Sequence, residues 1–486
     1  TTANAYNHVY RLAQDLFRSW DKLIRPTFLP ALSWERERVG EEDAWQFTNT
    51  LINIQVVLLA VLTVLLMVFP YPALRHFTKF QEVEATSLAV EFLVYLAPAV
   101  FFLSLAVTGY MLLNSYKRFQ LAAFGDHVFV KLTPLVVLAA LWHFFGIYAL
   151  ITGVVAGTLA KLALYIWGLR HQLKHYRLKV VLRSPAMRKM LWLMLPLLVG
   201  VLFSFGRNRF EDYFLTQVRQ GSATTIVTYA KSLVDIPIQL FPVALSIAIF
   251  PFLSGYFLEK RHEELFAILG KGVRMILLVF LPLTVGLILL AHPVIDVVFG
   301  GGKYTPEDVR LTAAVLQYYA IGYVVFGLEI LLLQFFYAAH DTVTPTITGV
   351  VTSVAQIVIL YLVVDSLQII SFTLAFSVSK TLKVLILLVL LVRVYPYRSL
   401  WVPMLRRTGR AVLKITLAAA VMGVVVYLLS GLLASRLPTD RTVTGILHLF
   451  ITVGTGGIVF IVGVHLLGVE EWRQALDWLK GRLGRR

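Results

Sequence analysis

The chain has 486 residues, of which 58% are hydrophobic and 15% are charged, and it contains no cysteine. So high an apolar content excludes a soluble globular protein, and the lack of cysteine excludes disulfides and thiolate metal sites. The net charge of +17 would favour nucleic-acid binding in a soluble protein. Here the basic residues gather in the connections on one side of the predicted membrane spans, so no nucleic-acid partner is expected.

The first predicted element is a helix over residues 4–31 that carries a stripe of cations. Arg11, Arg18 and Arg25 follow one another at a spacing of seven residues, which returns to nearly the same side of a helix. The stripe covers about 21 Å of a hydrocarbon core about 30 Å thick. Two arrangements fit, an amphipathic helix on the membrane surface or a span that lines a wet cavity, and we favour the span. Guanidinium groups in such a cavity would bind an anion, and phosphate above all.

Two further features of this segment affect the arginines. Asp15 and Asp21 lie at helical distances from the arginines and can pair with them. Pro26 and Pro30 predict that the helix bends or ends nearby, which moves Arg25 to the inner mouth of the cavity.

Twelve further apolar segments of about 20 residues predict an all-α polytopic membrane protein with about thirteen spans. The segments are 51–69, 88–112, 127–146, 147–170, 190–217, 224–254, 272–298, 311–338, 345–364, 368–393, 411–434 and 444–468. Lys and Arg are far more frequent in one alternate set of connections than in the other, which places the C-terminus in the cytoplasm and Thr1 outside.

The basic connection 171–189 divides the spans into two groups and predicts repeated lobes of the kind found in transporters. Because five spans precede it and six follow, we expect one further helix before Thr1 and a 6+6 arrangement with an appended pair. The expected parts are a first lobe (1–170), the linker (171–189), a second lobe (190–393), a terminal helix pair (411–468) and an amphipathic basic tail (470–486) that lies at the interface.

Ionisable residues inside spans are candidate functional residues because they are costly in lipid. Arg274 either lines the cavity or anchors its helix at the cytoplasmic end. Lys231 and Asp235, four residues apart, either serve the site or pair with each other. Glu329 has no evident base near it in the sequence, and Lys383 can extend its amine to the interface. The charged cluster from Arg207 to Asp212 can neutralise itself or lie at the outer mouth.

No catalytic constellation is recognisable, so the chain is predicted not to be an enzyme and to have no catalytic residue, metal or cofactor. The run Gly300–Lys303 resembles a phosphate loop but joins two spans. Thr305 to Asp308 after it predict a helix start, with an N-cap, a proline at the first position and acids in the first turn.

Several sequence motifs together resemble the MurJ/MviN family of lipid II flippases. They are Leu281–Pro293 with Val298-Phe299-Gly300 and Lys303-Tyr304-Thr305, then Phe336-Tyr337-Ala338, Asp341-Thr342 and Thr344-Pro345, and also Tyr229-Ala230, Pro237, Pro251–Ser254 and Leu113-Asn114 with Arg118-Phe119. The resemblance runs over most of the chain, and the block 298–345 is its most specific part.

The resemblance implies fourteen helices around a cationic cavity, with the family's first helix absent before Thr1. It implies movement of a polyprenyl-diphosphate-linked saccharide, the peptidoglycan precursor lipid II, across the bacterial inner membrane. Arg274 falls on an arginine of the family's eighth helix, Arg11 and Arg18 fall on basic positions of its second helix, and Asn4 stands where the family has an acid. We expect a monomer among membrane lipids, and the membrane potential, Na⁺ and H⁺ remain open as driving forces.

Three alternatives make different predictions. A flippase for another polyprenyl-diphosphate oligosaccharide would share the cationic cavity. A multidrug or cation exporter of the same superfamily would have a cavity lined by acids. A membrane transferase would carry paired carboxylates or a histidine on a large outer loop, and the outer loops here are short.

Overall fold

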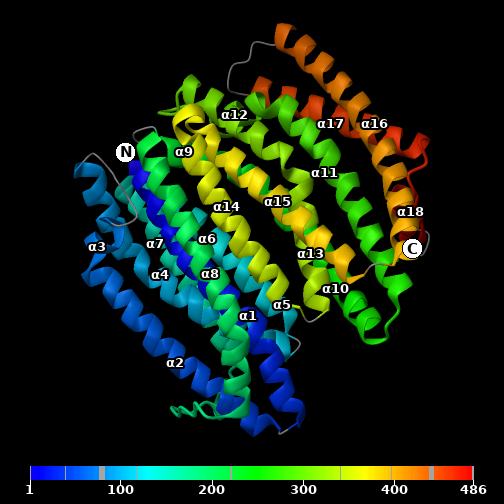
Figure 1. Ribbon diagram of the computed structural model, residues 1–486. Helices are drawn as coiled ribbons and strands as arrows, with labels where there is room; N and C mark the ends of the chain where they lie inside the picture. Colours follow the sequence, from blue (N-terminus) through cyan, green and yellow to red (C-terminus); the bar gives the residue numbers. More distant parts are fainter. Residues whose placement is uncertain are drawn as a thin grey trace. The chain divides into compact units, whose positions relative to one another are not determined.

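The computed structural model describes residues 2–38, 40–75, 83–116, 118–218, 222–339, 341–395, 397–436 and 443–483. Within these ranges the chain is helical throughout, apart from connections and one isolated bridge between Gly301 and Tyr304, so the all-α prediction is confirmed (Figure 1). The chain forms two compact units, Thr1–Thr224 and Thr225–Arg486, which we describe separately.

The first unit contains eight α-helices, a π-helical turn and a 3₁₀ turn in its described residues. These are α1 (Thr2–Arg38), α2 (Glu41–Val68), α3 (Pro70–Arg75), α4 (Val83–Ser115), α5 (Phe119–Phe124), η1 (Gly125–Phe129), α6 (Val130–Phe145), α7 (Ile147–Gly168), η2 (Leu173–His175) and α8 (Pro185–Val218).

The second unit contains ten α-helices over the part of the chain that the structure describes. These are α9 (Ala223–Leu240), which begins just before the boundary, α10 (Pro242–Leu258), α11 (His262–Phe299), α12 (Pro306–Ile321), α13 (Tyr323–Ala338), α14 (Val343–Leu367), α15 (Ile370–Val394), α16 (Arg398–Arg436), α17 (Val443–Leu466) and α18 (Glu470–Leu483).

Among the described residues, ten helices are long and apolar enough to cross a membrane, or eleven if α12 and α13, which meet at a bend of 45°, form one span. The count is lower than the thirteen expected spans for two reasons. The charged side chains of α1 exclude it, and α6 has only 16 residues. Each expected span nevertheless coincides with a helix or a pair of helices in chain order.

The apolar face of α1 is buried inside the first unit. Val9 and Leu12 pack in one core cluster with Phe92 of α4, and Phe28 stacks on Phe47 of α2 at a ring distance of 5.6 Å. Because protein covers this face, α1 does not use it to lie on a membrane surface.

The helix α1 also runs through both of its prolines, so of the two expected outcomes, a bend or an end, the end does not occur. Proline removes a backbone donor, but hydroxyl groups and neighbouring helices can compensate for it within a membrane. In the same stretch the Thr27 hydroxyl donates to the Leu23 carbonyl at 2.6 Å.

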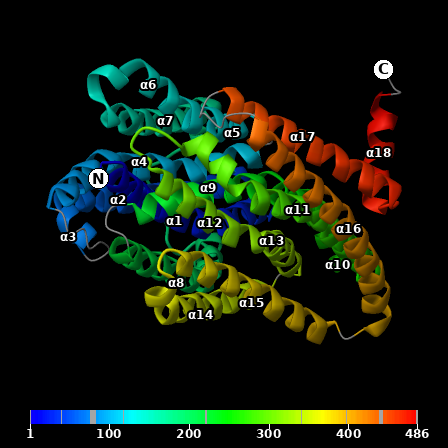
Figure 2. The same ribbon diagram turned by 90° about the horizontal axis from the view of Figure 1, so that it is seen from above.

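The helix α8 packs on α1 and belongs to the first compact unit (Figure 2). Its charged residues account for this placement, as described below. The division into lobes at the linker 171–189, with α8 opening the second lobe, stays a prediction.

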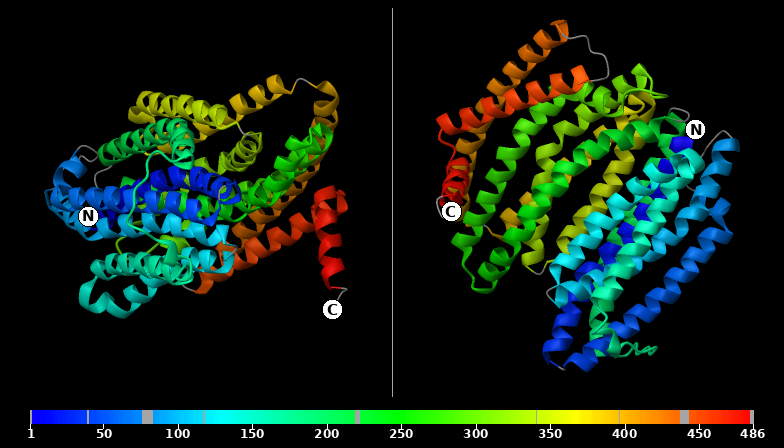
Figure 3. Two further views of the ribbon diagram at one scale, coloured as in Figure 1. Left: turned by 90° about the horizontal axis from the view of Figure 1, so that it is seen from below. Right: turned by 180° about the vertical axis from the view of Figure 1, so that it is seen from behind.

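In the second unit, α11 packs against α12, α13 and α16, and α14 lies beside α15. The pair α16 and α17 also lies side by side, as Figure 3 shows. The predicted helix start before α12 is confirmed, because Thr305 and Asp308 form a reciprocal capping box.

Candidate functional site

The first arginine of the α1 stripe is paired with acids on α8. Arg11 Nη2 lies 3.0 Å from Asp212 Oδ1 and 3.8 Å from Glu211 Oε1. Arg209 binds Asp212 from the same helix at 2.9 Å and also forms an ion pair with Asp15 of α1. Asp212 is fully buried, so these pairs hold a desolvated carboxylate between two guanidinium groups.

This network ties α1 to α8 and explains why α8 joins the first unit. The cluster on α8 neutralises itself only in part, because Arg209 and Asp212 also reach across to α1. A neighbouring hydrogen bond joins the same two helices, because Asn208 of α8 donates to Asp15 of α1 at 3.1 Å. The positive charge of Arg11 is therefore largely neutralised by the acids of α8, and this ion pair holds the two helices together.

The other two arginines of the stripe have different surroundings. Arg25 is paired with Asp21 as expected, with Nη2 at 2.8 Å from Oδ1, and its guanidinium lies 4.7 Å from the centre of the Tyr110 ring. Arg18 is exposed, and it makes no ion pair with any residue in the described ranges. Within α1, Arg18 is thus the stripe's guanidinium best placed to bind an external anion.

Arg274 is buried against the tail. Its Nε lies 2.5 Å from Glu471 Oε1 of α18, and both side chains are buried. The tail was expected to lie at the membrane interface, and the structure shows that its first turn docks on α11 through this pair.

The same arginine forms part of the wall of a cavity of about 440 Å³ between the first turns of α11 and α16. The other charged residues of the wall are Glu263, Glu264 and Arg407. Two cations and two anions give this cavity no net charge, so it has no electrostatic preference for an anionic solute.

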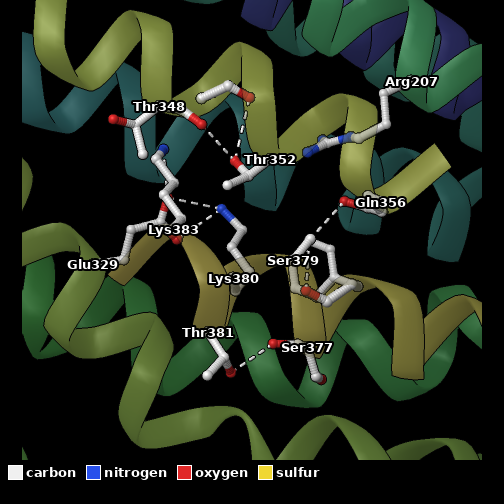
Figure 4. Close-up of polar contacts among 12 residues, drawn as sticks. Arg207, Glu329, Thr348, Thr352, Gln356, Ser377, Ser379, Lys380, Thr381 and Lys383 are labelled. Carbon is white, nitrogen blue, oxygen red and sulfur yellow. Dashed lines mark hydrogen bonds and ion pairs between the residues drawn. The ribbon is translucent and has the colours of Figure 1, made fainter. Parts of the chain in front are cut away.

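A second group of buried charges lies among α13, α14 and α15. Glu329 is 6% exposed, and its carboxylate accepts from Lys380 Nζ at 2.7 Å and from Lys383 Nζ at 2.8 Å (Figure 4). The bases that the sequence did not reveal near Glu329 therefore come from α15, more than 50 residues later in the chain. Lys383 does not extend to the interface, because its side chain is 13% exposed and its amine faces Glu329.

Lys231 of α9 belongs to the same neighbourhood. Its Nζ lies 5.5 Å from the centre of the Phe376 ring, and Lys380 Nζ lies 5.5 Å from the centre of that same ring. The expected partner was Asp235, but no ion pair joins the two in the part of the chain that the structure describes. Asn4, another candidate site residue, has a side chain that the structure does not describe.

Polar side chains continue along the contact between α14 and α15. Thr352 donates to the Thr348 carbonyl at 2.8 Å, and Ser379 donates to Gln356 Oε1 at 3.2 Å (Figure 4). All four side chains are buried. The Thr352 bond satisfies a hydroxyl within α14, and the Ser379–Gln356 bond joins α15 to α14 without adding charge.

Sequence reasoning assigned no site role to Lys380 or Phe376. The signal was present, because Phe376, Lys380 and Lys383 lie at spacings of four and three residues and so share one face of a helix. The sequence could not show what these side chains contact, because Lys231 comes from α9 and Glu329 from α13. Among the described residues, no group of three or more His, Asp or Glu side chains could hold a metal ion.

Comparisons with known proteins agree with the resemblance noted in the sequence. The family model of the lipid II flippase MurJ matches residues 1–443. A probable lipid II flippase MurJ of Bdellovibrio bacteriovorus is 24% identical over 452 residues, which cover 92% of this chain and 84% of the relative.

Two solved structures share the fold. A lipid II flippase MurJ in an inward closed conformation matches with a TM-score of 0.77 at 20% identity, over 98% of this chain and 93% of the other. An inward-facing multidrug resistance MATE family transporter of the MOP superfamily matches with a TM-score of 0.65 at 13% identity, over 80% and 89%. Because the family model spans most of its length, the chain belongs to the family of MurJ lipid II flippases.

Proposed function

We propose that this chain moves lipid II from the inner to the outer leaflet of the bacterial cytoplasmic membrane by alternating access, with Arg18 binding the diphosphate. The observation that carries the proposal is the exposed Arg18 on the polar side of α1, which makes no ion pair within the described ranges. A guanidinium fork matches phosphate oxygens in a bidentate manner. Its removal should cost on the order of 1–3 kcal/mol of anion binding.

The other arginines take supporting roles in this proposal. Arg25 shares its charge with Asp21 and guides the diphosphate at one end of the stripe. Arg11 positions α1 through Asp212. Arg274 carries its charge in the contact with Glu471 and contributes to transport only where that contact opens.

The membrane potential is the proposed driving force. A potential that is negative inside draws the empty cationic site inward, at about 2.3 kcal/mol per elementary charge per 100 mV. The protein would act as a monomer with a cytoplasmic C-terminus and without a cofactor, and Na⁺ or H⁺ would be dispensable. Transport that stops when Na⁺ is removed at constant potential would contradict this.

The buried acids argue against a multidrug or cation exporter, the alternative that shares this fold. Asp212 lies between Arg11 and Arg209, and Glu329 lies between Lys380 and Lys383. Each of these two carboxylates thus already contacts two cationic side chains, which disfavours a cationic drug as its partner.

The test is a translocation assay in proteoliposomes with fluorescent lipid II. The expected result is movement of lipid II that depends on the protein and on an applied potential. A second lipid, with a different saccharide on the same polyprenyl diphosphate, tests the alternative substrate. Movement of that lipid alone would favour the related flippase, and movement of neither would contradict the proposal.

A further inference from the structure

Three lysines of the second unit, Lys231, Lys380 and Lys383, each lie beside Phe376, beside Glu329 or beside both, and we call them the lysine cluster. Lys380 and Lys383 share Glu329 at 2.7 and 2.8 Å. Lys231 and Lys380 both lie 5.5 Å from the centre of Phe376. The cluster thus joins side chains from α9, α13 and α15 within one unit.

The lysine cluster lies deep in the predicted membrane region. Lys380 follows Ile370, the first residue of α15, by ten residues, which is about 15 Å along the helix axis. Lys231 lies about 12 Å along α9 from Ala223. Both depths fall near the middle of a hydrocarbon core about 30 Å thick. Charged groups at such depths usually face a water-filled cavity or a ligand pathway.

The positive charge of the cluster is only partly neutralised. Lys383 binds Glu329, which it shares with Lys380, and Lys231 forms no ion pair with Asp235 in the described part of the chain. A surplus of positive charge within the membrane is unfavourable unless an anion or water reaches it.

The amine of Lys383 also remains accessible to a ligand. Its side chain is 13% exposed, whereas that of Glu329 is 7% exposed. An ammonium group has three N–H donors, so the bond to Glu329 does not saturate Lys383. Lysine offers a compact charge that suits an oxyanion arriving from several directions.

We propose that the lysine cluster is an oxyanion-binding site and that Glu329 is its internal counter-ion while the site is empty. This inference rests on the proposed function, because the ligand is either the diphosphate or a head-group carboxylate of the transported lipid. When the oxyanion arrives, it takes a place beside Glu329 and binds Lys231 and Lys383.

A purely structural ion cluster would behave differently, and Glu329→Gln separates the two cases. In the proposed site, loss of the internal counter-ion raises the net positive charge and strengthens oxyanion binding. In a structural cluster, the same change only removes a link between α13 and α15, lowers the thermal midpoint and leaves oxyanion affinity unchanged.

The experiment measures binding of inorganic diphosphate and of succinate to the purified full chain by calorimetry. We expect Lys231→Gln and Lys383→Gln each to weaken binding of the preferred anion by about tenfold. Glu329→Gln should tighten it, and Lys271→Gln, at an exposed lysine of α11, should leave it unchanged. Preference for diphosphate identifies the lipid's diphosphate as the ligand, and preference for succinate identifies a head-group carboxylate.

Equal affinity in all variants, or weaker binding in Glu329→Gln, would overturn the proposal. Lys231→Gln removes a contact with an aromatic ring and no described ion pair, so this variant should fold even if those at Glu329 do not. Lipid II translocation keeps the two proposals apart. Translocation that is unaffected by the cluster variants would refute the site alone, and anion binding without translocation would refute the flippase proposal alone.

Discussion

At the scale of single residues, the three arginines of α1 differ in how much of their charge is available to a ligand. Arg11 is held by Asp212, and Arg25 by Asp21. Arg18 is exposed and makes no ion pair within the described residues. The seven-residue spacing places the three side chains on one side of the helix. Which of their charges are neutralised depends on the acids that lie nearby, on α8 for Arg11 and on α1 itself for Arg25.

The first prediction separates stability from ligand binding at this stripe. Arg11→Ala leaves Asp212 with one cation fewer in a buried place, so it should destabilise the protein by about 3 kcal/mol. Arg18→Ala should change stability by less than about 0.5 kcal/mol, because surface substitutions seldom do more. Thermal unfolding in detergent, followed by tryptophan fluorescence, measures both. Equal losses in the two variants would show that Arg18 has a structural partner.

The sequence could identify the candidate residues but not their partners. Charged residues inside apolar spans stand out in any sequence, so Arg11, Arg274 and Glu329 were recognised from their position alone. Their ion pairs join helices far apart in the chain, and Glu471 follows Arg274 by 197 residues. Such contacts depend on tertiary packing, which no local pattern encodes.

At the scale of elements, buried ion pairs join α8 to α1 and so place α8 in the first unit. Asp15 of α1 and Arg209 of α8 should therefore be energetically coupled. We predict that Asp15→Asn and Arg209→Gln are each destabilising, and that the double variant is less destabilised than the sum by about 1–3 kcal/mol. A double-mutant cycle on thermal stability measures this coupling. Strict additivity would mean that apolar packing alone holds the two helices together.

Close packing of α7 against η1 and α6 depends on two glycines of α7. A Cβ atom on Gly157 would lie 2.6 Å from the Phe129 carbonyl oxygen, and one on Gly153 would lie 2.7 Å from Pro134 Cα. Since both neighbours are backbone, they cannot move aside as a side chain would. Gly157→Val should thus lower the thermal midpoint by several degrees. Gly454→Ala, where the new methyl group meets open space, is the matched control.

The tail helix α18 should be released when its ion pair is broken. Glu471→Ala leaves Arg274 buried without its carboxylate, at a cost of about 3 kcal/mol. We predict faster limited proteolysis within α18 and intact lipid II binding at Arg18. Proteolysis of Asp477→Ala, at an exposed position of the same helix, should match the wild type. Unchanged protection in Glu471→Ala would show that other contacts hold α18.

Most helices of the fold could be predicted from apolar length, because a membrane span needs about 20 apolar residues. The differences have physical causes. The helix α1 passes Pro26 and Pro30, since packing against other helices compensates for a missing donor. The bend of 45° between α12 and α13 lies at Gly322, within an apolar run that gave no sign of it.

At the scale of the whole molecule, each unit carries basic side chains within its predicted spans. The first unit presents Arg18 beside a network of paired charges, and in the second Lys380 and Lys383 bind Glu329 while Lys231 lies beside Phe376. A transporter of a lipid-linked diphosphate needs positive charge within the membrane that can bind the anion and release it again. The family membership and this charge distribution support the same substrate class.

The most direct test of the account is the rate of lipid II translocation by the Arg18→Ala variant in proteoliposomes under an applied potential. The account predicts a loss of about tenfold or more at low lipid II concentration, because a charge-assisted contact to the diphosphate is removed. Arg18→Lys should retain part of the rate, since the positive charge remains. Translocation by Arg18→Ala at the wild-type rate would contradict the central claim that this arginine binds the transported anion.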